Sequence, residues 1–406
     1  MREIILISFL GPDQPNQFTR LMQVLSAHSL QILDVGQAVI HNQLTLGIVV
    51  SSDDQTATAL AMKEILILAH DIGLTVRFKP ISAAEYEQWV REGGRTRYIV
   101  TALAPELNAS HLQAVTQIVS SQGFNIETVT RLSGRPELDG SNNGPKRACV
   151  QFGLKGQMLD AAAMRAACLS LSTNLNVDVA VQEDNAYRRN RRLVCFDMDS
   201  TLIEQEVIDE LAIEAGVGIQ VSEITERAMQ GELDFQQSFR ARVALLKGMD
   251  ASVLPKIAER LTVTEGAERL ISTLKALGYR TAILSGGFQY FAEYLQAKLG
   301  IDEVHANVLD VQDGVVTGEV KGHIVDGARK ALLLREIADN MGISLEQTIA
   351  VGDGANDLPM LSIAGLGVAF RAKPLVRQNA NQAISSVGLD GVLYLLGVHD
   401  KDLSRA

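Results

Sequence analysis

Residues 193–201 have the sequence LVCFDMDST, in which four apolar residues run directly into two aspartates separated by one methionine. A short apolar run of this kind is typical of a strand buried on both faces, as in the parallel sheets of α/β proteins. Side chains two positions apart on a strand point the same way, so we expect Asp197 and Asp199 to do so. Because close carboxylates repel each other unless a cation joins them, and aspartate oxygens suit Mg²⁺, the segment predicts a magnesium site. A carboxylate-rich turn is the alternative.

Two further segments continue this α/β pattern along the chain. An apolar run at 281–284 leads into SGG at 285–287, and another at 348–351 leads into GDGAND at 352–357. Short apolar runs that alternate with long helical patterns indicate a parallel sheet with right-handed crossovers. Functional residues of such sheets gather beyond the carboxyl ends of the strands. We therefore expect the three segments to meet at one site.

Each segment can supply a different part of a phosphoryl-transfer site. One of the first two carboxylates would attack phosphorus while its neighbour exchanges a proton with the leaving group. The hydroxyl of Ser285 and the bare backbone N–H groups beside it can hold phosphate oxygens, and Lys330 adds a positive charge. Asp353 and Asp357 offer two more carboxylates to the cation. An EF-hand-like calcium loop is the competing interpretation, but the sequence lacks the acid that such a loop needs about nine residues further on.

Together these motifs, in this order, resemble the haloacid dehalogenase superfamily of phosphotransferases, whose first motif is Asp-x-Asp-x-Thr. The resemblance covers about residues 190–400. Residues 204 to about 274 have a mostly helical pattern, which is similar to the cap of the phosphoserine phosphatase family. The resemblance implies Mg²⁺-dependent hydrolysis of O-phospho-L-serine to L-serine and phosphate through an aspartyl-phosphate intermediate, the last step of serine biosynthesis.

The resemblance also implies roles for individual residues. Asp197 would be the nucleophile, and Asp199 would be the general acid and base. Mg²⁺ would be held by the side chains of Asp197 and Asp353 and by the main-chain carbonyl of Asp199. The remaining core residues implied by the family pattern are Ser285, Gly286, Lys330 and Asn356, which would bind the phosphoryl group, and Thr201, Gly287 and Asp357, which would support the site.

Substrate choice would rest with the cap. Glu206 matches the family position that meets the substrate ammonium, and Arg242 matches the one that grips its carboxylate. The planar fork of arginine suits a carboxylate and an anionic glutamate complements an amino group, so the pair would select a zwitterion. Phe235 would shield the closed site from water. Taken singly, each of these residues is ordinarily a surface charge or a core aromatic, and only the family pattern assigns the roles.

The N-terminal part of the chain carries one pattern twice. The order strand, helix, strand, strand, helix, strand occurs over 1–85 and again over 96–183, where the second helix is expected at 159–171. This order describes a ferredoxin-like sandwich. Both units resemble ACT domains, and the resemblance implies that Asp13 receives an amino acid effector such as serine. Dimerisation without an effector is the alternative role.

Composition restricts the location and partners of the chain. A formal net charge of −11 argues against a nucleic-acid partner, and the four arginines within 188–192 are expected to form a solvated linker. No apolar run approaches the roughly 18 to 20 residues of a membrane helix, and the run at 4–10 is too short for a signal peptide. Cys149, Cys168 and Cys195 lack metal-site spacing and are expected to be buried, reduced thiols. We expect a cytoplasmic homodimer.

The predicted fold class is α/β, with a Rossmann-like parallel-sheet phosphatase core and helical cap over 184–406, preceded by two ferredoxin-like βαββαβ domains. Two other functions stay open. One is a phosphotransferase or phosphatase of the same superfamily that acts on another small phosphomonoester. The other is a non-catalytic amino-acid sensor, although the filled motif positions argue against it. Residues 134–146, rich in Gly, Pro, Asn and Ser, are expected to form an exposed hairpin loop.

Overall fold

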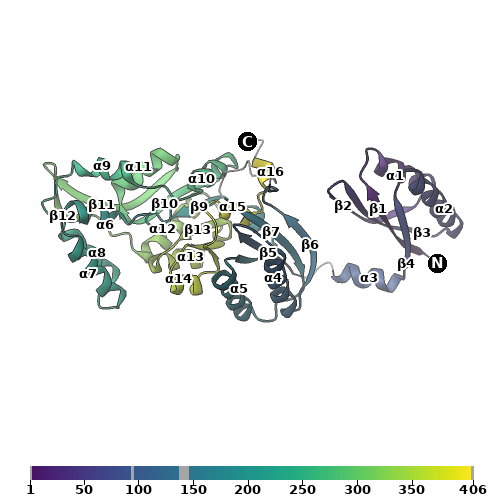
Figure 1. Ribbon diagram of the computed structural model, residues 1–406, viewed down its shortest axis with the longest axis horizontal. Coiled ribbons are helices and arrows are strands. Elements are labelled where there is room, and N and C mark those ends of the chain that lie inside the picture. Colours follow the sequence, from purple (N-terminus) through teal and green to yellow (C-terminus); the bar gives the residue numbers. More distant parts are fainter. Residues whose placement is uncertain (1, 93–95, 137–145, 404–406) are drawn as a thin grey trace. The chain divides into compact units, whose positions relative to one another are not determined.

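The computed structural model describes residues 2–92, 96–136 and 146–403 (Figure 1). The chain divides into two compact units, Met1–Arg95 and Thr96–Ala406. Most of the loop predicted at 134–146 lies outside the described residues. The limits given above for three domains stay a prediction.

The first unit is an antiparallel four-stranded sheet with the strand order β2-β3-β1-β4, against which two helices pack (Figure 1). Leu21 of one helix and Ile65 of the other are buried in the same core as Ile7 of the central strand. The elements of this sandwich are β1 (Glu3–Pro12), α1 (Gln17–Ala27), β2 (Gln31–Ile40), β3 (Gln43–Ser52), α2 (Gln55–Asp71) and β4 (Thr75–Ile81).

The helix α3 (Ala83–Glu92) follows this sheet and was not anticipated from the sequence. Its start is fixed by a reciprocal pair of hydrogen bonds. The Ser82 N–H donates to Glu85 Oε2 at 2.8 Å, and the Glu85 N–H donates to Ser82 Oγ at 3.2 Å. A serine followed three residues later by glutamate is the signature of a capping box, so the sequence did contain a signal for this helix.

The second unit opens with the same order of elements, in a sheet of strand order β6-β7-β5-β8. Its helix predicted at 159–171 instead begins at Ala161 and ends at Leu175. The reason is Asp160, whose carboxylate accepts hydrogen bonds from the N–H groups of Ala162 and Ala163 and so starts the helix. The elements are β5 (Arg97–Ala104), α4 (Ala109–Ser121), β6 (Asn125–Arg131), β7 (Ala148–Lys155), α5 (Ala161–Leu175) and β8 (Asp178–Glu183).

A seven-stranded sheet of order β12-β11-β10-β9-β13-β14-β15 forms the rest of this unit (Figure 1). All neighbours run parallel except β11 and β12. The strands are β9 (Leu193–Phe196), β10 (Arg280–Phe288), β11 (Glu303–Gln312), β12 (Val315–Lys321), β13 (Thr348–Gly352), β14 (Leu366–Phe370) and β15 (Gln382–Ile384). The helices that follow these strands are α11 (Gln289–Leu299), α12 (Gly327–Asn340), α13 (Leu358–Ile363), α14 (Pro374–Asn379), α15 (Gly391–Leu395) and α16 (Asp400–Leu403).

Helices fill the long connection between β9 and β10. They are α6 (Val207–Glu214), α7 (Gly218–Met229), α8 (Phe235–Ala244), α9 (Val253–Arg260) and α10 (Ala267–Ala276). The two passages into and out of this helical group lie side by side, because the Glu204 N–H donates to the Thr262 carbonyl at 3.0 Å and the Thr264 N–H donates to the Leu202 carbonyl at 2.9 Å. The predicted fold class, a parallel-sheet core with helical insertion and antiparallel N-terminal sheets, is confirmed.

The arginine-rich segment before β9 differs from the prediction of a solvated linker. Arg188 and Arg191 are each only 5 % exposed. Arg191 donates to the Gln182 side chain and to the Gly365 carbonyl, so it joins the second sandwich to the parallel sheet. Arg189 and Arg192 are exposed, so the prediction failed only for the other two arginines. A run of charges carries no information about which of them a neighbouring domain covers.

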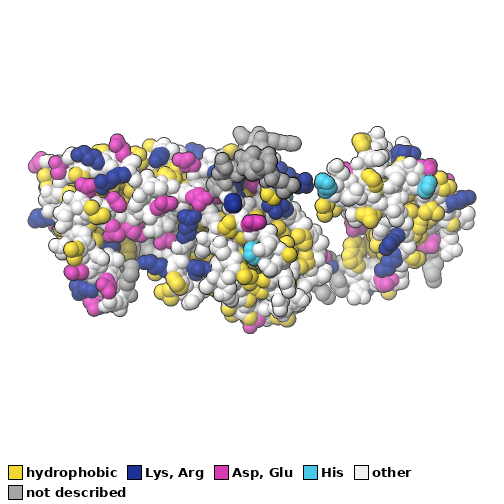
Figure 2. All heavy atoms as spheres, viewed as in Figure 1, with side chains coloured by type: hydrophobic (Ala, Val, Ile, Leu, Met, Phe, Trp, Pro, Cys, Tyr) yellow, Lys and Arg dark blue, Asp and Glu magenta, His cyan; other side chains and the backbone are white. Residues whose placement is uncertain are grey.

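Charged side chains of both signs are interspersed on the face of the molecule seen in Figure 2. This mixture accompanies the formal net charge of −11. Within the described ranges, no helix combines the length and the apolar character that crossing a membrane requires.

Candidate active site

The three predicted motif segments lie side by side, because β9 pairs in parallel with β10 on one side and with β13 on the other. Their carboxyl ends open into a cavity of about 110 Å³, which the helical cap covers from the other side. The predicted residues that line this cavity are Asp197, Asp199, Glu206, Phe235, Arg242, Gly286, Gly287, Asp353 and Asn356. Four other predicted residues, Thr201, Ser285, Lys330 and Asp357, are fully buried around it.

Asp197 presents one oxygen to the protein and leaves the other free. Its Oδ1 accepts a hydrogen bond from the Met198 N–H at 2.7 Å and lies 2.9 Å from Lys330 Nζ. In the part of the chain that the structure describes, no donor reaches Oδ2 of this carboxylate. The carboxylate is therefore fixed in orientation, with one oxygen available for attack on an electrophile in the cavity.

Lys330 stands between two carboxylates. Its Nζ lies 2.9 Å from Asp197 Oδ1 and 2.7 Å from Asp357 Oδ1, and its side chain is completely buried. Burial alone lowers the pKa of this ammonium, but the two carboxylates outweigh burial and raise the pKa above its ordinary value. Asp357 also accepts from the Gly354 N–H at 2.9 Å, so it holds both Lys330 and the loop after β13.

The carboxylates here form a group that fits a divalent metal ion. Oxygens of Asp197, Asp353 and Asp357 lie within 4.8 Å of one another. Burial raises the pKa of Asp197 well above its usual range, with a further contribution from Asp357, and burial raises the pKa of Asp353 to about 7. Ionising these acids together is costly without a cation, and hard carboxylate oxygens suit a small divalent ion. The chemistry of this donor set therefore fits the metal that the family pattern implies.

Asp199 lies on the cap side of the site. Its Oδ1 accepts a hydrogen bond from the Val207 N–H at 3.0 Å, at the start of the first cap helix. Burial, followed by the nearby Glu206 carboxylate, raises the pKa of Asp199 to about 8. A carboxyl group that holds its proton near neutral pH can act as a general acid, and later as a general base.

Ser200 and Thr201, which follow Asp199, hold neighbouring side chains in position. Ser200 adopts a φ of +54°, and its hydroxyl donates to Glu206 Oε1 at 2.8 Å, which orients the predicted ammonium ligand. Thr201 Oγ1 donates to Asp353 Oδ1 at 3.1 Å and so holds a predicted metal ligand.

The carboxyl-terminal end of β10 is held by a residue that the sequence analysis missed. Asn307 donates from Nδ2 to the Gly286 carbonyl at 2.8 Å and accepts at Oδ1 from the Val325 N–H at 2.8 Å. Ser285 Oγ accepts from the Gly287 N–H at 2.9 Å. A single asparagine on an unremarkable strand gives no signal of this role, because the contact depends on the pairing of β10 with β11.

The cap closes the cavity with an apolar wall and one arginine. The ring centroids of Phe235 and Phe239 are 6.0 Å apart, and those of Phe239 and Phe288 are 5.7 Å apart. Phe239 and Phe288 were missed, although Phe239 lies one helical turn after Phe235. Arg242 lines the same cavity, and its buried Nε has no hydrogen-bond partner among the described residues. Burial lowers the pKa of Arg242, while Glu206 opposes that shift.

Replacing Gly287 with alanine should lower kcat/KM for a small phosphomonoester by roughly 10²-fold, since small displacements of catalytic groups cost about that much. A Cβ at this position would collide with the Asp199 carboxylate and lie 2.7 Å from Met198 Cε. The matched control is Gly36→Ala, because a Cβ there meets no described atom within 4 Å. Phosphate release by the two variants checks the expectation, and equal activity would contradict it.

Comparisons with known proteins place this geometry in a family. Residues 194–362 match the haloacid dehalogenase-like hydrolases, and residues 3–79 match the ACT domain. The chain is 40% identical over 408 residues to a phosphoserine phosphatase of Streptomyces coelicolor, covering 99% of this chain and 94% of the relative. It is 39% identical to a phosphoserine phosphatase of Mycobacterium tuberculosis, covering 99% and 95%.

A solved structure agrees with these relatives. The unliganded probable phosphoserine phosphatase of Vibrio cholerae superposes with a TM-score of 0.59 and 33% identity, covering 78% of this chain and 90% of that chain. The match therefore includes more than the catalytic sheet. With full-length relatives near 40% identity, the chain belongs to the phosphoserine phosphatase family of haloacid dehalogenase-like hydrolases.

Proposed function

We propose that the chain hydrolyses O-phospho-L-serine to L-serine and phosphate, with Mg²⁺ bound by the side chains of Asp197 and Asp353 and the main-chain carbonyl of Asp199. One observation carries the proposal: a single small cavity faces Asp197 on one side and both Glu206 and Arg242 on the other. A phosphate ester of a zwitterion has complementary groups for both sides. Family membership makes the chain a phosphoric monoester hydrolase.

The first half of the proposed reaction uses the two motif aspartates. Oδ2 of Asp197 attacks phosphorus, and its new bond forms as the bond from phosphorus to the serine oxygen breaks. Asp199 gives its proton to that leaving oxygen, which its raised pKa of about 8 supports. When bound, Mg²⁺ would neutralise negative charge on the phosphoryl oxygens. Lys330 would add positive charge from the protein side.

The second half regenerates the enzyme. Asp199, now ionised, takes a proton from a water molecule that attacks phosphorus, and the bond from phosphorus to Asp197 breaks to release phosphate. Ser285, Gly286 and the Asn356 side chain would hold the phosphoryl oxygens. Phe235 would limit access of bulk water. The closeness of its ring to Gly286 supports this role, since a Cβ added to Gly286 would lie 2.9 Å from the ring.

The test of this function is phosphate release from O-phospho-L-serine, O-phospho-L-threonine and p-nitrophenyl phosphate, each with Mg²⁺ and with a chelator. We expect activity that depends on Mg²⁺ and a kcat/KM highest for phosphoserine. Activity without preference would leave a phosphatase of another small phosphomonoester. A stoichiometric new ester instead of free phosphate would indicate a phosphotransferase, and no turnover of any substrate would leave an amino-acid sensor.

Replacing Arg242 with alanine should lower kcat/KM for phosphoserine by roughly 10²-fold, since loss of one partner of a desolvated charge pair costs about 2 to 5 kcal/mol. Phosphoethanolamine keeps the ammonium and lacks the carboxylate, so its kcat/KM should change by less than about threefold, a residual effect of cap packing. Arg240→Ala is the control, because Arg240 lies exposed on the same helix, α8. Equal losses on both substrates would mean that Arg242 acts through structure alone.

We also propose that the ACT-like first unit binds an amino acid effector such as serine near Asp13. This residue is exposed and its N–H donates to the Asn42 carbonyl at 2.9 Å, while Gln17 Oε1 accepts from the Gln14 N–H at 3.0 Å, so the loop is built around fixed polar contacts. Calorimetric titration of the full chain with L-serine, with Asp13→Asn as the comparison, tests the site. Unchanged binding in the variant would remove Asp13 from it.

A cytoplasmic homodimer completes the proposal. Cys149, Cys168 and Cys195 are all buried and unpaired, as suits a reducing compartment. The edge strand β2 exposes Val35 and Val39, which could be covered by a second copy of the chain. Sedimentation of the full chain would measure its mass in solution, and a monomer would contradict the dimer.

A further inference from the structure

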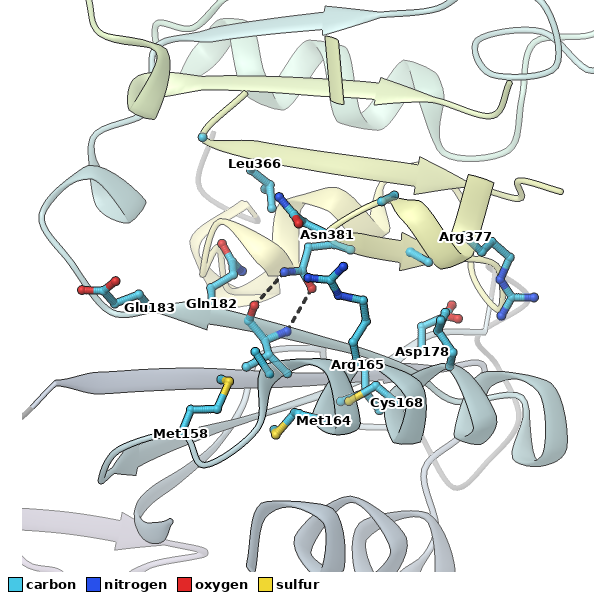
Figure 3. Close-up of a pocket in the computed structure, with 18 of the residues that line it drawn as sticks. Met158, Met164, Arg165, Cys168, Asp178, Gln182, Glu183, Leu366, Arg377 and Asn381 are labelled. Atoms are coloured by element: carbon cyan, nitrogen blue, oxygen red, sulfur yellow. Dashed lines mark hydrogen bonds between the residues drawn. The ribbon is translucent and has the colours of Figure 1, made fainter. Parts of the chain in front are cut away.

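The second unit contains a cavity of about 330 Å³ that is distinct from the catalytic cavity. It lies between α5 and β8 of the antiparallel sandwich and the segment from α14 to β15 of the parallel sheet (Figure 3). It shares no lining residue with the catalytic cavity, within the ranges that the structure describes. Its volume falls within the roughly 300 to 1,000 Å³ of small-molecule sites.

The walls of this junction cavity are tied together by specific polar contacts. The side chain of Gln382 accepts from the Val181 N–H at 2.9 Å and donates to the Val181 carbonyl at 2.6 Å, drawn as dashed lines in Figure 3. The Asp178 carboxylate accepts from Ser172 Oγ and from Ser386 N–H and Oγ, at 2.6 to 2.7 Å. These hydrogen bonds therefore hold both walls of the cavity in place before any ligand binds.

Three arginines line the cavity, and none forms an ion pair with a carboxylate among the described residues. Arg191 is 5 % exposed, and its Nε has no hydrogen-bond partner in the described chain. The same holds for the buried Nε of Arg377, whose Nη2 donates to Ser172 Oγ at 2.7 Å. Arg165 extends from α5 across the cavity toward the parallel sheet, as Figure 3 shows.

The buried Arg191 is costly unless an anion accompanies it, whereas Arg377 is half-buried and Arg165 is exposed. Taking a guanidinium out of water without a counter-charge is destabilising, and like charges nearby add to the cost. Burial, followed by the neighbouring Arg188, lowers the pKa of Arg191 to about 10. The charge of Glu346 opposes this shift, but Glu346 and Glu183 are exposed to solvent and the Asp178 carboxylate is already engaged by serine donors, so none of these acids pairs with Arg191 within the described residues.

We propose that the junction cavity binds a small organic carboxylate. Three arginines line the cavity, and guanidinium N–H groups suit a planar carboxylate. The wall formed by α5 and the segment before it also carries Met158, Met164 and Cys168 (Figure 3), and this sulfur-rich surface suits a compact hydrocarbon part. At roughly 30 Å³ for a group the size of a water molecule, the cavity holds a ligand of about ten non-hydrogen atoms. The two exposed glutamates disfavour ligands that carry several negative charges.

The test is calorimetric titration of the full chain with 3-phenylpropanoate, 4-methylpentanoate and benzoate. At least one of these acids should bind, and its matched neutral amide should bind at least tenfold more weakly. Arg165→Gln should weaken binding of the acid at least tenfold, because Arg165 is an exposed lining residue that forms no hydrogen bond or ion pair within the described residues. Arg335→Gln, an exposed arginine of α12 outside the cavity, should bind as the unchanged chain does.

Other outcomes overturn the proposal. Failure of all three acids to bind, or equal affinity for acid and amide, would rule out carboxylate recognition. Arg242→Gln separates this cavity from the catalytic one, where a carboxylate could also bind. Binding that Arg242→Gln removes and Arg165→Gln retains would assign the acid to the catalytic cavity. Thermal unfolding of Arg165→Gln should match the unchanged chain, which shows that a loss of binding is local.

Discussion

Replacing Asp197 with asparagine should lower kcat for phosphate release by at least about 10⁴-fold, the order seen when a catalytic nucleophile is removed. An amide can occupy the same space, but its oxygen is a far weaker nucleophile than a carboxylate, so no phosphoenzyme forms. The fold should persist, since the Met198 N–H and Lys330 at 2.7 and 2.9 Å can still donate to the amide oxygen.

Two measurements check this expectation. Rapid acid quenching after mixing with phosphoserine should trap phosphoprotein in the unchanged chain and none in Asp197→Asn. The matched control is Asp339→Asn, an exposed aspartate of α12 outside the catalytic cavity, which should keep full activity. Phosphoprotein in the variant, or a kcat within tenfold of the unchanged chain, would mean that another group attacks phosphorus.

The sequence was sufficient for the strands that carry the motifs. Each apolar run ends where polar residues begin, and parallel strands bring such ends to one edge of the sheet. Asp197, Gly286 and Asp353 therefore could be placed together from the sequence alone, and the structure does bring them to one cavity. Local pattern and topology agree at these positions, because both follow from burial of the strands.

The sequence was insufficient wherever a role depends on contacts between distant segments. Asn307 holds the Gly286 carbonyl across two strands, and nothing in its local sequence distinguishes it from any strand asparagine. Arg191 was assigned to a solvated linker, yet it is buried at the junction of two folded parts. Which charges a neighbouring domain covers depends on the packing between domains. That packing leaves no repeating pattern in the sequence.

Replacing Lys330 with methionine should lower kcat by about 10³-fold, because a fixed positive charge near the transferring phosphoryl group is lost. Methionine keeps much of the apolar stem but leaves Asp197 and Asp357 without the cation between them. An unpaired buried charge costs about 3 to 5 kcal/mol, so the free energy of unfolding should fall by that amount in metal-free buffer near neutral pH. Lys256→Met, on an exposed position of α9, is the control.

The loss of stability should depend on pH in a defined direction. Without Lys330 the pKa of Asp197, already raised mainly by burial, rises further, since Lys330 is the neighbour that lowers it. A carboxyl whose folded pKa exceeds its unfolded value loses stability as pH rises, so the variant should be closest to the unchanged chain below about pH 4. Denaturant unfolding across pH measures this difference.

A second substitution distinguishes uncompensated charge from poor packing. Lys330→Met combined with Asp357→Asn removes one of the two carboxylates that Lys330→Met leaves without a cation. The double variant should recover about half of the lost free energy of unfolding, while activity stays low. Asp357 has no exposed surface, so its amide would fill the same space. If the double variant were no more stable than Lys330→Met, the loss would come from the packing of methionine, and the charge of Lys330 would serve catalysis alone.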